Sequence, residues 1–309
     1  MKEGADINLI KIIKDDLYPE IVRASAVEYL VGYQNERSYN VIKEMLNDPE
    51  PIVRISAINS FIATDPQHLN RMLSPLLNDP QKAVRIQAAN KLSRLRKEEF
   101  TEAQFKLLTK VLDEYLQTLK YSADFPAGRY NLGNYYSNQG DVLNAEKNYK
   151  KAIEYDNLFY PAKSNLAMLY YNSGKLNEAE DLFIDLIKNH PEYIEGNYFL
   201  GLLYAEQKRY REAAENLEIA AAKSISNARI YYNLGLLYQY LNEFTKAENS
   251  LLKAYTILPN DFDIIYALAD FYIKRGNSKK AALYAQEINE KFPSNPAGQN
   301  LLNHINSRM

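Results

Sequence analysis

The side chains best suited to metal binding or proton transfer are three histidines, His68, His190 and His304. No two of them have the spacing of a metal-binding pair, and His190 stands in a turn between two helical segments. The chain has no cysteine, which excludes disulfides, thiolate catalysis, thiolate metal sites and covalent haem attachment within it. No phosphate-binding glycine-rich loop and no nucleophile elbow occurs. We therefore expect no catalytic residue, no metal site and no cofactor, and predict that the chain is not an enzyme.

Tyrosine is the residue type that recurs at regular intervals. The chain has 26 tyrosines and no tryptophan. A step of 34 residues separates three series of positions, which are Tyr136, Tyr170, Tyr204, Tyr238 and Tyr272; Ala145, Ala179, Ala213, Ala247 and Ala281; and Leu132, Leu166, Leu200, Leu234 and Leu268. Five copies therefore run in tandem without insertion or deletion, over residues 126–295.

Each copy has the pattern of two helices joined by a turn. In the first copy Leu132, Gly133 and Tyr136 lie three and four residues apart, which is helical spacing. Residues 138–141 (Asn-Gln-Gly-Asp) then predict a turn, because glycine tolerates the left-handed conformation that ends a helix. Ala145 begins the apolar face of a second helix. One such hairpin cannot bury its apolar face alone, so the pattern predicts stacked hairpins.

The period and the matched residues resemble the tetratricopeptide repeat, a family of helical hairpins. In the first copy the matching residues are Leu132, Gly133, Tyr136, Ala145, Tyr149 and Ala152. The tryptophan that the family often carries in its first helix is absent. The resemblance implies an all-α, right-handed solenoid with five hairpins over 126–295, closed by a capping helix at 296–309.

The first hundred residues repeat with a different period. Arg23, Arg54 and Arg85 follow one another at steps of 31, and two of these units open with Asn-Asp-Pro, at Asn47 and Asn78. Asp followed by Pro is typical of a helix start. The pattern is similar to short HEAT-type repeats, which implies three helical hairpins over 1–96. Thr101 and Gln104 form a capping-box pattern, so we expect a connecting helix within 97–125.

The tetratricopeptide resemblance also implies a concave groove lined by positions 2, 5, 9, 12 and 13 of each copy, counted from Pro126. Position 5 is tyrosine in four of the five copies, and tyrosine is favoured in binding surfaces because it offers apolar area and a hydroxyl group. The alternative is that these tyrosines pack between neighbouring repeats. The expected groove residues are Tyr130, Asn134, Ser164, Met168, Tyr171, Tyr198, Leu202, Arg229, Tyr232, Leu236, Gln239, Tyr266 and Asp270.

These features favour a non-enzymatic scaffold that binds a protein or peptide. Position 5 lacks the lysine with which some family members hold a terminal carboxylate, so an extended peptide or a partner helix suits the groove better. The 37 basic and 39 acidic residues give a net charge of −2, which argues against nucleic-acid binding. No apolar run of about 18 residues occurs, so we expect no membrane insertion. The sequence does not predict the oligomeric state.

The order of the parts suggests an alternative role. Two repeat arrays joined by EYLQTLKYSADFPAGRYNLGNYY are similar to the C-terminal half of bacterial multihaem cytochrome c-type proteins, in which Cys-x-x-Cys-His motifs precede the arrays. This chain has no such motif, so electron transfer is assigned to none of its residues. The resemblance implies an assembly module of a periplasmic redox complex.

A third hypothesis is a regulatory domain for a separately encoded enzyme. The first residues, MKEGADINLIKIIKDD, lack the apolar core of a signal peptide. We therefore expect a cytoplasmic location for the chain as it stands, and a periplasmic one if it belongs to a longer cytochrome-type protein.

Overall fold

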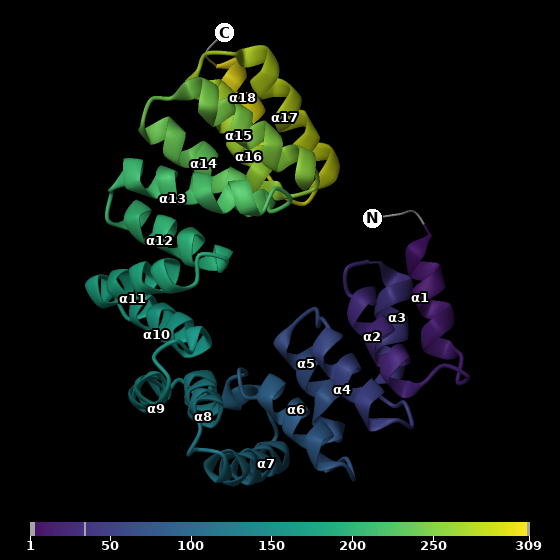
Figure 1. Cartoon of the computed structure of the whole chain (residues 1–309). Coiled ribbons are helices and arrows are strands. Elements are labelled where there is room, and N and C mark those ends of the chain that lie inside the picture. The colour runs from purple at the N-terminus through teal and green to yellow at the C-terminus, as the bar shows by residue number, and fades with distance from the viewer. Residues whose placement is uncertain (1–3, 34, 308–309) are drawn as a thin grey trace. The chain divides into compact units, whose positions relative to one another are not determined.

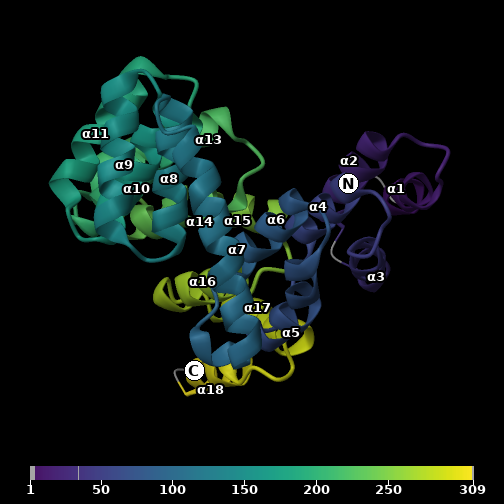
Figure 2. The ribbon, with the colours of Figure 1, turned by 90° about the horizontal axis from the view of Figure 1, so that it is seen from below.

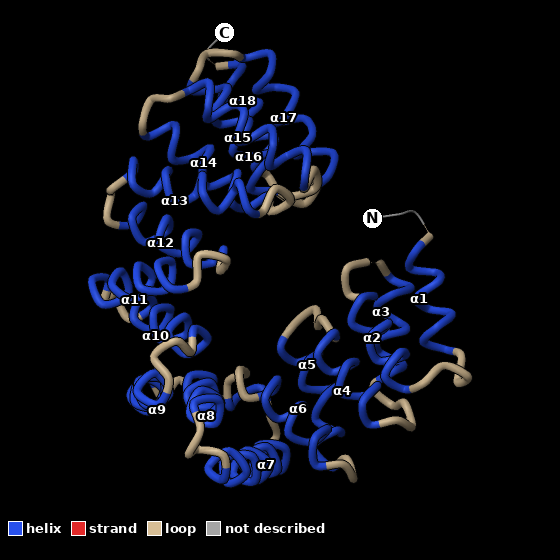
Figure 3. Tube along the Cα trace, viewed as in Figure 1, coloured by secondary structure: helices blue, strands red, loops and turns tan. Residues whose placement is uncertain are grey.

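The fold is all-α, as predicted (Figure 1). The computed structural model describes residues 4–33 and 35–307, and within them it contains helices and loops but no strand (Figure 3). The chain divides into two compact units, Met1–Phe159 and Tyr160–Met309, which are described separately below as unit 1 and unit 2. The boundary falls inside the predicted 34-residue array, so its first hairpin belongs to unit 1 and the other four to unit 2.

Unit 1 begins with helix pairs and ends with one hairpin of the 34-residue pattern. Its helices α2, α4, α6 and α7 pack against one another in chain order. The helices are α1 (Ala5–Lys14), α2 (Glu20–Leu30), α3 (Glu36–Met45), α4 (Pro51–Ser60), α5 (Pro66–Leu73), α6 (Lys82–Leu92), α7 (Glu102–Tyr121), α8 (Pro126–Asn138) and α9 (Val142–Tyr155), with short 3-10 segments at Ser74–Asn78 and Lys97–Glu99.

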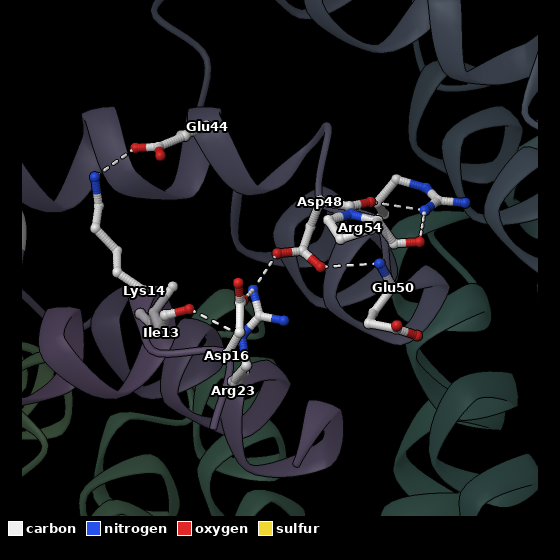
Figure 4. A network of polar contacts seen from close by, with 9 residues as sticks. Ile13, Lys14, Asp16, Arg23, Glu44, Asp48, Glu50 and Arg54 are labelled. Atoms are coloured by element: carbon white, nitrogen blue, oxygen red, sulfur yellow. Dashed lines mark hydrogen bonds and ion pairs between the residues drawn. The ribbon is translucent and has the colours of Figure 1, made fainter. Parts of the chain in front are cut away.

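A series of ion pairs accounts for the 31-residue period. The arginine of one helix pair binds the aspartate that opens the next, as with Arg23 on Asp48 (Figure 4). Arg54 binds Asp79 through two hydrogen bonds of 2.8 and 2.9 Å. Arg23, Asp48, Arg54 and Asp79 are all buried, and Arg23 also donates to the carbonyl of Ile13 at 3.0 Å. Each pair therefore ties one helix pair to the next.

The third arginine and the connecting helix complete this arrangement. Arg85 donates to Glu114 of α7 at 3.1 and 3.2 Å, so α7 takes the place of a further repeat. The capping box at the start of α7 is confirmed, since Gln104 donates its backbone N–H to the Thr101 hydroxyl while the Gln104 side chain accepts from the Thr101 backbone. Leu112 and three other apolar side chains of α7 are buried.

Unit 2 contains four hairpins and a final helix (Figure 2). First helices begin at residues 160, 194, 228 and 262, and second helices at 176, 210, 244 and 278, so both series keep the predicted step of 34. The helices are α10 (Tyr160–Asn172), α11 (Leu176–Asn189), α12 (Ile194–Glu206), α13 (Tyr210–Lys223), α14 (Ala228–Tyr240), α15 (Phe244–Ile257), α16 (Phe262–Lys274), α17 (Ser278–Lys291) and α18 (Ala297–Asn306). Helix α18 packs on α17.

Small residues let the two helices of a hairpin approach closely. A Cβ atom on Gly201 would lie 2.8 Å from Cγ of Leu217, and one on Gly235 would lie 2.6 Å from Cγ of Leu251. Both distances are shorter than carbon–carbon contact allows, so only glycine fits with the leucines in these positions. The leucines themselves are fully buried.

The turn inside each hairpin has one residue in the left-handed conformation. Gly174, Asn242 and Gly276 have φ of 73°, 59° and 69°, which matches the predicted use of glycine and asparagine. The third hairpin places Lys208 there with φ of 62°, which the residue type did not predict. The backbone of the turn is therefore kept even where the side chain is unfavourable for it.

We predict that Arg54→Met lowers the free energy of unfolding by about 3–5 kcal/mol, because it leaves the Asp79 carboxylate buried without a counter-charge. Urea denaturation followed by circular dichroism measures the loss. Replacing Asp79 by Asn in the same variant removes the buried charge and should recover part of it.

The matched control is Lys14→Met. Lys14 binds Glu44 at 2.7 Å, but the two side chains are 46% and 55% exposed. Because exposed ion pairs contribute little, we expect a loss below about 1 kcal/mol. Equal losses for the two variants would show that the buried pair does not tie the helix pairs together.

Candidate functional site

The position-5 side chains reach toward the segment that follows their own hairpin. In unit 1 the ring of Tyr130 lies edge-on to Phe159, with centroids 5.7 Å apart. In unit 2 Ser164 is buried, and its hydroxyl lies 2.7 Å from that of Tyr193 in the next inter-repeat turn. The hydroxyl of Tyr198 accepts a hydrogen bond of 3.4 Å from Asn233 of the next hairpin. These side chains thus join successive hairpins.

Position 5 of the last two hairpins carries more open surface. The Arg229 guanidinium lies 5.2 Å from the centre of the Tyr232 ring and 3.4 Å from the Asp263 carboxylate. Burial, with Asp263 nearby, raises the pKa of Tyr232. Tyr266 is 39% exposed, and its ring lies 5.9 Å from that of Phe262. Tyrosine at this position therefore presents an edge to solvent while its base packs against neighbours.

Four of the predicted groove residues line two adjoining pockets of unit 2. The first, here called the apolar pocket, has a volume of about 220 Å³. The second, the charged pocket, has a volume of about 380 Å³. The apolar pocket is lined by Leu202 and Ala205 of α12, Tyr210 and Leu217 of α13, and Asn233, Leu236, Leu237 and Tyr240 of α14. The charged pocket is lined by Leu236, Gln239 and Tyr240 of α14, Phe244 of α15, and Asp270, Lys274 and Arg275 at the end of α16.

An exposed aromatic ridge separates the two pockets. Tyr240 stacks on Tyr210 with ring centroids 4.8 Å apart and planes 15° apart, yet it is 67% exposed. Leu236 and Tyr240 line both pockets, so the pockets share one wall. A large tyrosine held in place by another ring loses little entropy on binding, which makes this ridge a suitable anchor for a partner.

The charged pocket has one cation in excess. Lys274 binds Asp270 at 2.6 Å, so these two charges are paired. Arg275 lies over the Phe244 ring, 3.8 Å from its centre, and no acidic side chain in the described part of the chain lies within ion-pair distance of it. Two cations and one carboxylate leave a local charge of +1 in a protein whose net charge is −2.

The sequence analysis missed five of these pocket residues, which are Tyr210, Tyr240, Phe244, Lys274 and Arg275. Tyr240 and Lys274 occupy position 13, which the tetratricopeptide resemblance already assigned to the groove. Tyr210 and Phe244 both occupy position 17, at the start of the second helix. Aromatic residues at position 17 of two consecutive copies were the signal that could have found the ridge.

The remaining predicted groove residues lie outside the two pockets. Asn134 of unit 1 accepts a hydrogen bond of 2.8 Å from the Tyr149 hydroxyl. Met168 and Tyr171 of α10 are half-buried. Burial, together with a hydrogen bond to the Glu206 carboxylate, raises the pKa of Tyr171 to about 12. Position 12 thus also joins one hairpin to the next.

The histidines have structural surroundings. The His68 ring nitrogens lie 3.0 Å from the hydroxyls of Tyr39 and Thr64. The His190 ring packs beside Tyr160 with centroids 5.2 Å apart. Among residues 4–33 and 35–307, no three His, Asp or Glu side chains gather in a way that could hold a metal ion. No helix in the same range is long and apolar enough to cross a bilayer.

Comparison with known families assigns the repeats. Three segments match models of the tetratricopeptide repeat, at residues 127–157, 164–228 and 242–305. The chain contains tetratricopeptide repeats. Such repeats are generally non-enzymatic modules that bind peptides or proteins, and nothing in the comparisons points to catalysis. No curated protein sequence matches the chain.

Solved tetratricopeptide structures share the fold. A crystal structure of MamA is 24% identical, with a TM-score of 0.51 over 53% of this chain and 95% of its own. MamA from Desulfovibrio magneticus RS-1 is 21% identical, with a TM-score of 0.52 over 55% of this chain and 96% of its own. YrrB, described as a TPR protein with an unusual peptide-binding site, is 17% identical, with a TM-score of 0.52 over 60% of this chain and 95% of its own. At these identities the likeness shows the fold alone.

The raised pKa of Tyr171 predicts a loss of stability at high pH. The folded state favours the neutral phenol, so its stabilising effect is complete below pH 10 and decreases as the pH rises through about 12. In a spectrophotometric titration, the difference between wild type and Tyr171→Phe should show one tyrosine that ionises near pH 12. A difference curve centred near pH 10 would contradict the contact with Glu206.

Proposed function

We propose that this protein is a non-enzymatic interaction scaffold that holds an extended segment of a partner protein along the groove positions of its tetratricopeptide repeats. The observation that carries the proposal is the pair of adjoining pockets around Tyr240. Positions 9, 12 and 13 of successive hairpins supply much of their lining, as the family resemblance implies for a groove. The tetratricopeptide assignment supports a protein or peptide as the partner.

The shape of the pockets favours an extended peptide over a bulky helix. Each pocket has room for one or two side chains, at about 220 and 380 Å³. The ridge of Tyr240 stands between them and would separate neighbouring side chains of a bound strand. Alternate side chains of an extended peptide commonly fill separate pockets in this way.

Tyr198 and Tyr232 are proposed to extend the surface along the same array. Both are half-buried, so each keeps an open edge although it also contacts a neighbouring hairpin. Tyrosine anchors of this kind contribute strongly to binding because they combine apolar area with a hydroxyl group. The 13 residues predicted from the sequence therefore remain the proposed groove, with Tyr210, Tyr240, Phe244, Lys274 and Arg275 added to it.

The test replaces both tyrosines. A displayed library of random peptides is selected on the full chain, and the affinity of the best peptide is measured by fluorescence anisotropy. Tyr198→Ala with Tyr232→Ala should weaken binding by at least about 2 kcal/mol, while far-UV circular dichroism stays unchanged. The control is Tyr121→Ala, since Tyr121 is 94% exposed and lies outside the groove. An unchanged affinity in the double variant would overturn the role of the groove.

We also propose that residues 1–96 are HEAT-like repeats, followed by a connecting segment at 97–125, five tetratricopeptide units at 126–295 and a cap at 296–309. The first assignment is supported by helix pairs whose arginines bind the aspartate of the next pair, as Arg23 and Arg54 do. The last is supported by Leu301 and Ile305 of α18, which are buried.

The alternative role is that of a C-terminal module in a multihaem cytochrome-type redox complex. It is supported by the order of the parts and by the linking segment at residues 114–136. The donor set of this chain does not fit covalently attached haem, because the chain has no cysteine. Any haem would therefore belong to another segment or another chain.

An antibody against residues 126–295 tests this alternative on a blot of the native source stained in parallel for haem. The alternative predicts a band well above the calculated 35.6 kDa that stains for haem. A haem-negative band at the calculated mass would contradict it and favour an independent scaffold.

A further inference from the structure

The two pockets differ in chemistry, and this difference indicates what a bound peptide must contain. This inference rests on the proposed function and concerns the partner that the same groove would select. The apolar pocket has three leucines, Leu202, Leu217 and Leu236, and one polar side chain, Asn233. Asn233 already donates to the Tyr198 hydroxyl. An aliphatic side chain is therefore the group that fits this pocket without leaving a buried polar atom unpaired.

The charged pocket offers a cation that is held in place but not neutralised. The Phe244 ring covers one face of the Arg275 guanidinium at 3.8 Å. Stacking of this kind engages the face of the guanidinium and leaves the N–H groups in its plane able to donate to a carboxylate. The neighbouring cation Lys274 is already paired with Asp270, so Arg275 is the group that remains for a ligand.

The shared wall determines how far apart the two ligand groups lie. Because Leu236 and Tyr240 line both pockets, the side chains that fill them must be close neighbours in the bound peptide. Side chains on the same face of an extended strand are two residues apart, roughly 7 Å. The residue between them would point away from the groove and over the ridge of Tyr240.

We propose that these paired pockets select an extended internal segment of a partner protein in which an aliphatic residue and an acidic residue stand two positions apart. The aliphatic side chain enters the apolar pocket, and the acidic side chain binds the Arg275 guanidinium. A protein of opposite local charge fits the surplus cation of the charged pocket.

Selection from a displayed random library on the full chain tests the proposal, because displayed peptides are fused and present no free terminal carboxylate. We expect enrichment of Asp or Glu two positions from Leu, Ile or Val. The best peptide is then synthesised with an amidated C-terminus. Changing its acidic residue to Gln should weaken binding to wild type about fivefold, since the ion pair is partly exposed.

Variants of the protein assign the effect to one residue. Binding of the Gln-substituted peptide should equal that of the acidic peptide on Arg275→Gln, and Arg275→Glu should prefer a lysine in place of the acid. The matched control is Arg211→Gln, because Arg211 is 73% exposed and lines neither pocket. It should keep the full fivefold preference.

The outcomes distinguish this inference from the function on which it rests. Peptides that bind in a manner sensitive to Tyr198→Ala with Tyr232→Ala, but without acidic preference, would overturn only the acidic motif. The motif would also fall if a peptide whose sole carboxylate is a free C-terminus bound as tightly as the selected one. If no peptide bound the wild-type chain, both the motif and the peptide-binding function would be overturned.

Discussion

The close crossing of the two helices in each hairpin is the constraint on which the repeat array depends. At Gly201 and Gly235 the missing side chain lets Leu217 and Leu251 approach to a distance that even a methyl group would prevent. This contact sets the spacing between the two helices, and the step of 34 residues repeats it. Because the crossing is the same in each hairpin, equivalent positions of the first helices fall on equivalent parts of the surface. The groove positions are thus a consequence of the packing.

Unit 1 joins its first helix pairs by a different interaction. There, buried arginines such as Arg54 hold the aspartate that opens the next pair, and the same aspartate accepts a backbone N–H of its own turn, as Asp79 does from Gln81 at 2.8 Å. A buried ion pair contributes little net stability, but it strongly disfavours any register that leaves either charge unpaired. Close packing of small residues and buried charge pairing are therefore two physical routes to the same result, which is a fixed register between successive helix pairs.

Much of the fold could be predicted from the sequence because its signals are local. The period, the apolar spacing, the turn glycines and the capping box of Thr101 each depend on residues within one hairpin. The parts that were missed depend on residues from several elements. Ser164 is buried because Tyr193 of the following turn reaches it. The ridge of Tyr240 exists because Tyr210 of the preceding hairpin supports it. Counting positions within one unit cannot show such contacts.

The residues that repeat and the residues that do not repeat have different roles. Leucine, alanine and glycine at their fixed positions build every hairpin in the same way, so they cannot distinguish one partner from another. Position 13 instead changes from Asn to Glu, Tyr and Lys along the array, and Tyr240 and Lys274 stand there beside the two pockets. Chemical variety along the surface therefore arises where the repeat is least regular. In an array of nearly identical hairpins, selectivity for a partner has to come from such departures, which is why the pockets around Tyr240 carry more information about function than the repeated core does.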